Sequence, residues 1–122
     1  MRANVPLKDL PENLRDDEEV VLNALIHGTS DTLKDASTRL RGMEKIVLAA
    51  VEKHGAALEH ASEELRRNKK IVLIAVHNYG YARKYISSKE LQDDPEILIA
   101  SETSINNIEE FSNRILNKLG IF

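Results

Sequence analysis

Residues 40–76, LRGMEKIVLAAVEKHGAALEHASEELRRNKKIVLIAV, decide the fold because one pattern occurs in them twice. Leu40 opens LRGMEKIVLAAV, and 25 residues later Leu65 opens LRRNKKIVLIAV. Segments with the same layout begin at Leu14 (LRDDEEVVLNAL) and at Leu91 (LQDDPEILIASE). Self-similarity at a fixed period is typical of repeat proteins. A chain of 122 residues is long enough for one domain built from such repeats.

Each repeat consists of two segments, a first segment that is densely apolar and a second segment with apolar residues three to five positions apart. The positions of the second-segment pattern hold Leu33, Ala36 and Leu40, then Leu58, Ala61 and Leu65, then Arg83, Ile86 and Leu91, then Ile108, Phe111 and Ile115, of which all but Arg83 are apolar. Spacings of three and four indicate an amphipathic helix. We therefore predict a single domain over residues 1–122, with a half-repeat at 5–14 and repeats at 14–39, 40–64, 65–90 and 91–119.

The ends of the first segments also favour helices over the alternative, a buried strand at 46–51 or 71–76. Asp and Asn are strong N-caps, Pro is favoured at the first helical position, and Gly is favoured at a left-handed C-cap. These residues stand where such helices would begin and end: Asp17, Asn68 and Asp94, then Pro95, then Gly28, Gly55 and Gly80. We predict helices at 18–27, 30–40, 44–54, 56–66, 69–78, 81–90, 95–102 and 105–118.

Helices of about ten residues are marginal alone in water, so they must pack against neighbouring repeats. Stacking would align equivalent residues in two columns: Leu22, Leu48, Leu73 and Ile99, and Ala24, Ala50, Ala75 and Ser101. The predicted fold class is all-α, an array of short helical hairpins with repeats of about 25 residues, stacked as a small α-solenoid.

The pattern resembles the short helical repeat of the family known as domain of unknown function 4116. The closest match lies in residues 40–76, with GAALEHAS at 55–62, and the resemblance extends over residues 7–115. Met43 departs from it where Asp or Asn is expected, as does Arg83 where Leu is expected. The resemblance implies a helical fold and, because the family has no established activity, it implies no catalytic residue.

Catalytic and metal-binding signatures are missing from the sequence. The chain has no cysteine, no G-x-S-x-G, no P-loop and no H-E-x-x-H motif, which excludes thiolate chemistry and the common hydrolase and nucleotide-binding signatures. Thr29, Ser30, Thr103 and Ser104 fit helix starts. No two histidines share a zinc-ligand spacing, and His27, His54, His60 and His77 are interpreted as surface residues. We expect no catalytic residue, no metal and no cofactor.

Apolar runs reach only six residues, and the amino terminus lacks the apolar stretch of a secretory signal. We therefore expect a cytoplasmic protein without a membrane partner.

Charge distribution is the most informative functional feature. The net charge is −3, yet residues 65–90 hold seven Lys or Arg against one Glu. All three tyrosines of the chain lie in this basic third repeat, at positions 79, 81 and 85. The extra residue between Ile86 and Leu91 predicts that the second segment here bulges or ends early.

Two interpretations of this band compete. Cations with aromatic residues suit an acidic partner or a phosphate. Alternatively, the cations neutralise adjacent repeats, with Glu19, Lys45, Lys70 and Glu96 in one column and Arg67 beside Asp93, although exposed ion pairs contribute little. The candidate partner-binding residues are Arg66, Arg67, Lys69, Lys70, Tyr81, Arg83, Lys84 and Tyr85.

We expect a non-catalytic protein–protein interaction module whose partner is unknown and acidic on its binding side. One alternative is an enzyme or nucleotide-binding domain without a recognisable signature. A second alternative is nucleic-acid or phosphate binding through the third repeat, which the overall negative charge disfavours because such affinity rests mainly on phosphate neutralisation.

Overall fold

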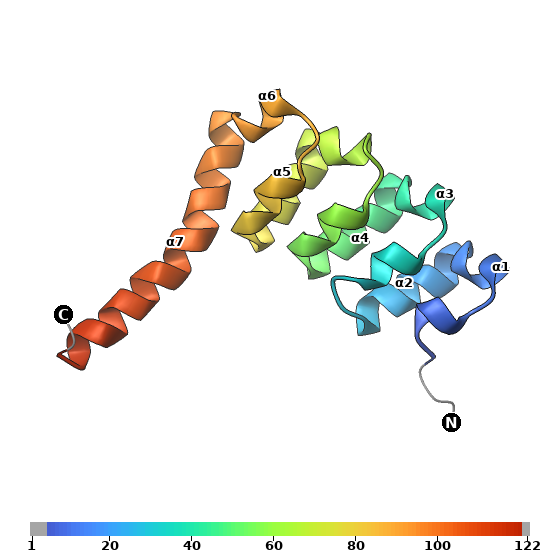
Figure 1. Cartoon of the computed structure of the whole chain (residues 1–122), viewed down its shortest axis with the longest axis horizontal. Helices are drawn as coiled ribbons and strands as arrows, with labels where there is room; N and C mark the ends of the chain where they lie inside the picture. Colours follow the sequence, from blue (N-terminus) through green and yellow to red (C-terminus); the bar gives the residue numbers. More distant parts are fainter. Residues whose placement is uncertain (1–4, 121–122) are drawn as a thin grey trace.

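The computed structural model describes the backbone of residues 5–120, and the side chains of that range except residues 106–112, 114 and 115. Within this range the chain is helical and contains no strand (Figure 1). The all-α class is confirmed, and the strand alternative at 46–51 or 71–76 is wrong. The α-helices are α1 Glu12–Arg15, α2 Glu18–His27, α3 Thr38–Arg41, α4 Glu44–Lys53, α5 Lys69–Asn78, α6 Lys89–Gln92 and α7 Pro95–Lys118. The 3-10 helices are η1 Leu7–Asp9, η2 Thr32–Asp35, η3 Gly55–His60, η4 Leu65–Arg67 and η5 Gly80–Tyr85.

The first segments of the repeats form the α-helices that the sequence predicts. Helices α2 and α5 have the predicted bounds, and α4 ends one residue early. The Asp17 side chain accepts a hydrogen bond from the Val20 amide at 3.0 Å, and Asn68 accepts one from the Ile71 amide at 3.2 Å. Helix α4 begins after Met43 without a side-chain cap, as the departure from the family pattern suggests.

The second segments differ from the prediction of continuous helices at 30–40, 56–66 and 81–90. Each begins as a 3-10 helix and then passes through an extended residue, Ala36, Ala61 or Ile86. A short helical turn follows and is capped by a serine hydroxyl, since Leu40, Leu65 and Leu91 donate their amides to Ser37, Ser62 and Ser88.

A backbone hydrogen bond to the preceding short helical turn, α1, α3 or η4, accounts for this break. The amides of Ser37 and Ser62 donate to the carbonyls of Arg15 and Arg41, both at 2.9 Å. In the third repeat Ser87 donates to Arg66 at 3.1 Å, whereas the cap comes from Ser88. Ser37 and Ser62 each supply both the backbone amide and the capping hydroxyl, whereas in the third repeat Ser87 supplies the amide and Ser88 the hydroxyl. This change accommodates the extra residue, and η5 ends early, as predicted.

The fourth repeat is not a hairpin. The predicted helices at 95–102 and 105–118 are one continuous helix, α7, which extends away from the other helices (Figure 1). The other first helices end within two residues of a glycine, whereas α7 continues through Thr103 and Ser104, so the predicted break there is wrong. The side chains of Ile108, Phe111 and Ile115 lie outside the described residues.

The glycines after the first helices have another role than the predicted left-handed cap. Within residues 5–120 only Gly120 has a positive φ, 73°. A Cβ on Gly55 would lie 2.3 Å from the Ala75 carbonyl oxygen, and one on Gly80 would lie 2.5 Å from that of Ser101. Gly55 and Gly80 therefore permit close approach of the next repeat.

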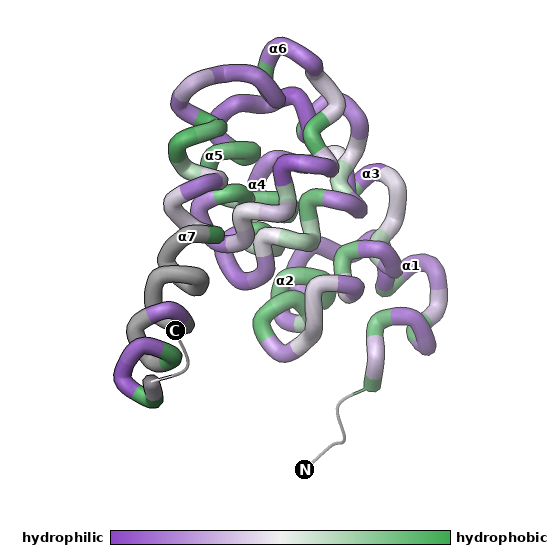
Figure 2. The backbone as a smooth tube through the Cα atoms, turned by 60° about the vertical axis from the view of Figure 1, so that its left-hand side comes forward, coloured by the Kyte–Doolittle hydropathy of each residue, from purple (hydrophilic) through white to green (hydrophobic). Residues whose placement is uncertain are grey.

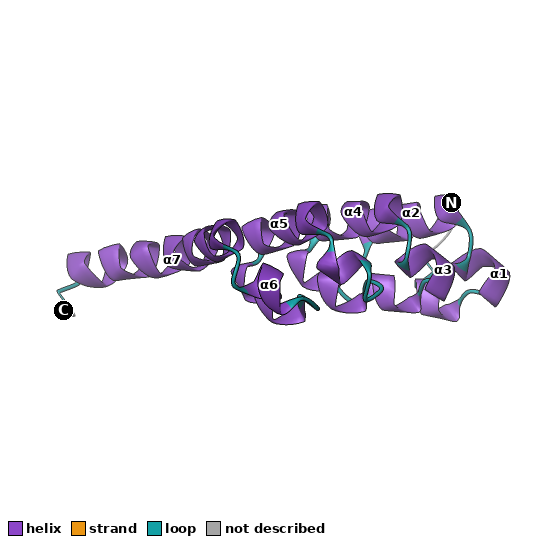
Figure 3. Ribbon diagram, turned by 90° about the horizontal axis from the view of Figure 1, so that it is seen from above, coloured by secondary structure: helices purple, strands orange, loops and turns teal. Residues whose placement is uncertain are grey.

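The first helices of successive repeats lie side by side in one layer, and the second segments lie in another (Figures 1 and 3). Helix α4 contacts α2 and α5, and α5 contacts α7. Figure 2 shows long hydrophobic stretches along α2 and α5. None of the described helices combines the length and the apolar character that a membrane span requires.

The core follows one of the two predicted columns. Ala50, Ala75 and Ser101 are buried, as predicted, and Ala24 is half-buried. The leucine column is wrong, because Leu22, Leu48 and Leu73 are half-buried and Ile99 is 65% exposed. The fully buried residues precede the leucines by one or two positions: Val21, Val47 and Val72, and Ile46, Ile71 and Ile97.

Candidate functional site

The eight candidate residues of the third repeat fall into two groups according to their contacts. Five of them take part in packing, hydrogen bonds or ion pairs within the protein: Arg66, Lys69, Arg83, Lys84 and Tyr85. The other three, Arg67, Lys70 and Tyr81, are exposed. The sequence places the eight residues in one block, but it does not separate these groups.

Lys69 is the cation most fully engaged with the next repeat. Its Nζ lies 3.1 Å from Asp94 Oδ2 and 3.1 Å from Glu96 Oε1. Hydrogen bonding to Asp94, and then to Glu96, raises the pKa of Lys69 above its ordinary value of 10.5. The same ammonium group lowers the pKa of Asp94 below 3.8. Lys69 therefore neutralises the start of α7.

Two arginines support the backbone. Arg83 donates from Nε to the Gln92 carbonyl at 2.7 Å, and its Nη2 lies 3.6 Å from Asp93 Oδ1. Arg66 donates to the carbonyls of Ala61 and Tyr85 at 3.3 and 3.4 Å. These contacts fix η5 against its neighbours, so the two side chains have a structural role.

Three of the candidate cations, Arg67, Lys70 and Lys84, form no ion pair with a described side chain. Lys84 Nζ lies 5.2 Å from the centre of the Tyr85 ring, a cation–π contact that leaves the ammonium group exposed. Tyr81 is 53% exposed, and its ring centre lies 5.7 Å from that of Tyr79.

Tyr81 and Lys84 line a hollow of about 450 Å³ between η5 and α7. Its other lining residues include Gly80, Arg83, Gln92, Ser101 and Ile105. The Ser101 hydroxyl donates to the Gly80 carbonyl at 2.9 Å, which holds the two walls together. Sequence reasoning missed Gln92, Ser101 and Ile105 because they come from the next repeat and lack charge. Their position in the repeat pattern was the only signal.

Internal neutralisation occurs, but between residues other than those predicted. Lys45 pairs with Glu18 at 3.1 Å rather than with Glu19. The expected neighbours Arg67 and Asp93 form no pair, because Asp93 lies 3.6 Å from Arg83 and 3.6 Å from Lys89. Lys69 replaces the predicted Lys70 as the partner of Glu96.

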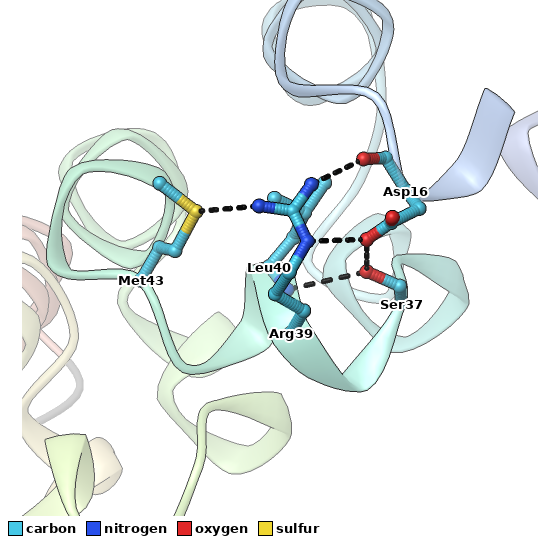
Figure 4. Close-up of polar contacts among 5 residues, drawn as sticks. All are labelled: Asp16, Ser37, Arg39, Leu40 and Met43. Atoms are coloured by element: carbon cyan, nitrogen blue, oxygen red, sulfur yellow. Dashed lines mark hydrogen bonds and ion pairs between the residues drawn. The ribbon is translucent and has the colours of Figure 1, made fainter. Parts of the chain in front are cut away.

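Asp16 is the centre of a similar contact between the end of α1 and the start of α3 (Figure 4). Its Oδ1 accepts from the Ser37 hydroxyl at 2.6 Å and from Arg39 Nε at 2.9 Å, and its carbonyl accepts from Arg39 Nη2 at 2.7 Å. The Ser37 hydrogen bond, followed by that of Arg39, lowers the pKa of Asp16 below 3.8.

His60 differs from the prediction of a surface residue, because its side chain is only 13% exposed. Its Nε2 lies 3.2 Å from Asp31 Oδ1 and 3.6 Å from Glu59 Oε1. These three residues could offer ligands to a metal ion, since their donor atoms lie within 4.8 Å of one another. Asp31 and Glu59 are exposed, and the His60–Asp31 contact also serves as a link between repeats. No sequence motif connects His60 with Asp31, because Asp31 is 29 residues away.

Comparison with known proteins supports the family resemblance. Residues 44–92 match the model of a family described as domain of unknown function (DUF4116). The matched segment begins with α4 and ends with α6, so it includes the second and third repeats and most of the hollow. No curated protein and no solved structure matches the chain.

Proposed function

Residues 44–92 of this chain belong to the DUF4116 family, and for the surface that they form with α7 we propose a non-catalytic protein-binding function. The repeats form a small α-solenoid in this proposal, and its third repeat receives an acidic segment of a partner protein. Stacked helical pairs with an extended surface are commonly used in this way.

One observation carries the proposal. Lys84 and Tyr81 are exposed at the mouth of a hollow, whereas the neighbouring cations Lys69 and Arg83 already have carboxylate partners. Among the described side chains Lys84 pairs with no carboxylate, whereas it would do so if neutralisation were the only role of the band. An exposed ammonium group and an exposed aromatic ring together suit a carboxylate-bearing peptide, since the ring adds apolar contact area to the charge.

The surroundings of the hollow favour a peptide over nucleic acid. The third repeat carries +6, but the whole chain carries −3. A nucleic acid would meet Asp93, Asp94 and Glu96 close to the cations, and it would be repelled along most of its length. A short acidic segment of a protein can end at the hollow and avoid those carboxylates.

Selection from a random peptide display library tests the proposal. We expect the immobilised chain to enrich sequences rich in Asp and Glu with at least one apolar residue. Binding of an enriched peptide should weaken as salt is raised, because exposed charges are screened over about 8–10 Å at 0.1–0.15 M.

The variants Lys84→Glu and Tyr81→Ala should each lower the affinity for that peptide by about tenfold or more without lowering the melting temperature of the protein. Lys53→Glu is the matched control, since Lys53 is an exposed lysine on α4 away from the hollow. The proposal fails if the enriched sequences carry no negative charge, or if Lys53→Glu weakens binding as much as Lys84→Glu. Preferential binding of a labelled single-stranded oligonucleotide would instead support the nucleic-acid alternative.

A further inference from the structure

Three side chains of the kinds that bind metal ions meet where the second repeat packs on the first. Asp31 comes directly before η2, and Glu59 and His60 are the last two residues of η3, which contacts η2. His60 Nε2 lies 3.2 Å from Asp31 Oδ1 and 3.6 Å from Glu59 Oε1. An imidazole nitrogen and two carboxylate oxygens from segments far apart in the sequence therefore face a common space.

The charge at this junction is unbalanced, unlike the charge at the other ionic contacts. Among the described residues, every other carboxylate that forms an ion pair has a Lys or Arg partner: Asp16, Glu18, Asp93, Asp94 and Glu96. In the same part of the chain, Asp31 and Glu59 pair only with His60. Because Nε2 carries at most one hydrogen, it can donate to only one of the two carboxylates. Even a protonated imidazole would leave one negative charge uncompensated.

The corresponding junction between the second and third repeats contains a cation of its own. Lys84 and Tyr85 take the positions of Glu59 and His60 in the repeat pattern. Lys84 Nζ lies 5.2 Å from the centre of the Tyr85 ring, so an ammonium group is present there. The excess of negative charge is therefore specific to the first junction and is not a general property of the repeat.

The distances at the first junction suit a divalent transition metal. Zinc binds imidazole nitrogen and carboxylate oxygen with bonds of about 2.0–2.2 Å, so two donors on a tetrahedral ion lie about 3.4 Å apart. This separation falls between the 3.2 Å and 3.6 Å that join His60 Nε2 to the two carboxylates. Two carboxylates would balance the charge of the ion, and an imidazole ligand favours zinc over magnesium or calcium.

The ligands are held in position by the surrounding chain. The Asp31 amide donates to Thr29 Oγ1 at 3.3 Å, and the Thr29 amide donates to Thr32 Oγ1 at 2.9 Å. The His60 ring is half-buried, which limits its movement. Binding an ion would therefore require little additional ordering.

We infer that Asp31, Glu59 and His60 bind a divalent transition-metal ion such as Zn²⁺, which joins the first repeat to the second. Three protein ligands leave the fourth position of a tetrahedral ion to water. Because Asp31 and His60 are 29 residues apart, the site exists only in the folded chain, and binding of the ion should stabilise the stacking. This inference is independent of the proposed function, since none of the three residues lines the hollow of the third repeat.

Thermal denaturation with and without Zn²⁺ tests the inference on the full chain. After treatment with EDTA and removal of the chelator, saturating Zn²⁺ should raise the melting temperature by about 5 °C or more, because an ion that binds the folded chain stabilises it. Mg²⁺ at the same concentration should have no effect, since it prefers oxygen ligands in octahedral geometry. Isothermal titration calorimetry should show one Zn²⁺ bound per chain.

Asp31→Asn and His60→Gln each remove one ligand and should lower the affinity for Zn²⁺ by about tenfold or more. His77→Gln is the matched control, because His77 is an exposed histidine on α5 and its loss should leave the affinity unchanged. With Co²⁺ in place of Zn²⁺, the visible absorption of a tetrahedral ion should appear in the parent and in His77→Gln, but not in His60→Gln.

Three results would overturn the inference. One is an unchanged melting temperature at saturating Zn²⁺, and another is equal affinity of the parent, Asp31→Asn and His60→Gln for the ion. The third is a loss of Zn²⁺ binding in His77→Gln, because the ion would then be held at another histidine.

Discussion

Ile71 and Leu73 are two residues apart on α5, yet they differ in what surrounds them. Ile71 is 0% exposed and lies between neighbouring first helices, whereas Leu73 is half-buried at the edge of the core. Both belong to the same apolar run, IVLIAV, so periodicity alone does not separate them. The difference arises from the direction in which α5 faces α4 and α7.

We expect Ile71→Ala to lower the free energy of unfolding by about 2–5 kcal/mol, because a fully buried aliphatic side chain would leave a cavity. Leu73→Ala should cost less than half as much, since water and flexible neighbours can fill the space at the surface. Urea denaturation of the two variants measures both values. A larger loss for Leu73→Ala would mean that α5 is rotated relative to its neighbours.

Asp16 makes stability depend on pH in the acid range. Its pKa is lower in the folded chain than the ordinary 3.8 because Ser37 and Arg39 donate hydrogen bonds to the carboxylate. A lowered folded-state pKa means that the contribution is fully present above the unfolded pKa and is lost as pH falls through the folded value. The melting temperature should therefore decrease as the pH is lowered below about 4.

Asp16→Asn removes this carboxylate, so the melting temperature should decrease less steeply as the pH is lowered below about 4. The part of the decrease that Asp94 causes should remain. The control is Asp35→Asn, because the Asp35 side chain forms no ion pair or hydrogen bond with a described residue. An unchanged acid decline in Asp16→Asn would show that the Ser37 and Arg39 hydrogen bonds are not maintained in solution.

Among the elements, the first helices could be predicted from the sequence, but the second segments could not. Asp17 and Asn68 start α2 and α5 through local hydrogen bonds, so the sequence around them contains the information. The break at Ala61 depends on the bond from the Ser62 amide to the carbonyl of Arg41, which ends α3 and lies 21 residues earlier in the chain. Apolar spacing cannot reveal a tertiary hydrogen bond, and the predicted helix at 56–66 was wrong for that reason.

Ser87 and Ser88 offer a test of how the extra residue is accommodated. Ser88 caps α6 through its hydroxyl, whereas Ser87 contributes its backbone amide to Arg66. Ser88→Ala should cost about 1 kcal/mol, the usual effect of losing an N-cap, and Ser87→Ala should have little effect. Thermal denaturation compares the two variants. Similar losses would contradict the division of roles between the serines.

For the whole molecule, stacking decides which side chains remain available at the surface. The sequence predicted the basic band as a block, but the structure assigns Lys69 to Asp94 and Arg83 to Asp93, and it leaves Lys84 exposed beside a hollow. Part of that hollow belongs to α7, so residues within the third repeat could not define it. A second hollow, lined by residues of η1, α2 and η2, likewise appears only when the helices are placed together.

The stacking itself is the central claim, and amide hydrogen exchange measured by NMR tests it most directly. The amides of Ser62 and Ser87 donate to carbonyls of the preceding short helical turn, at Arg41 of α3 and Arg66 of η4, whereas the Ser88 amide has no acceptor among the described residues. We predict that Ser62 and Ser87 exchange at least about tenfold more slowly than Ser88 after correction for intrinsic rates. Equally fast exchange at all three serines would contradict the stacking of these short turns on one another.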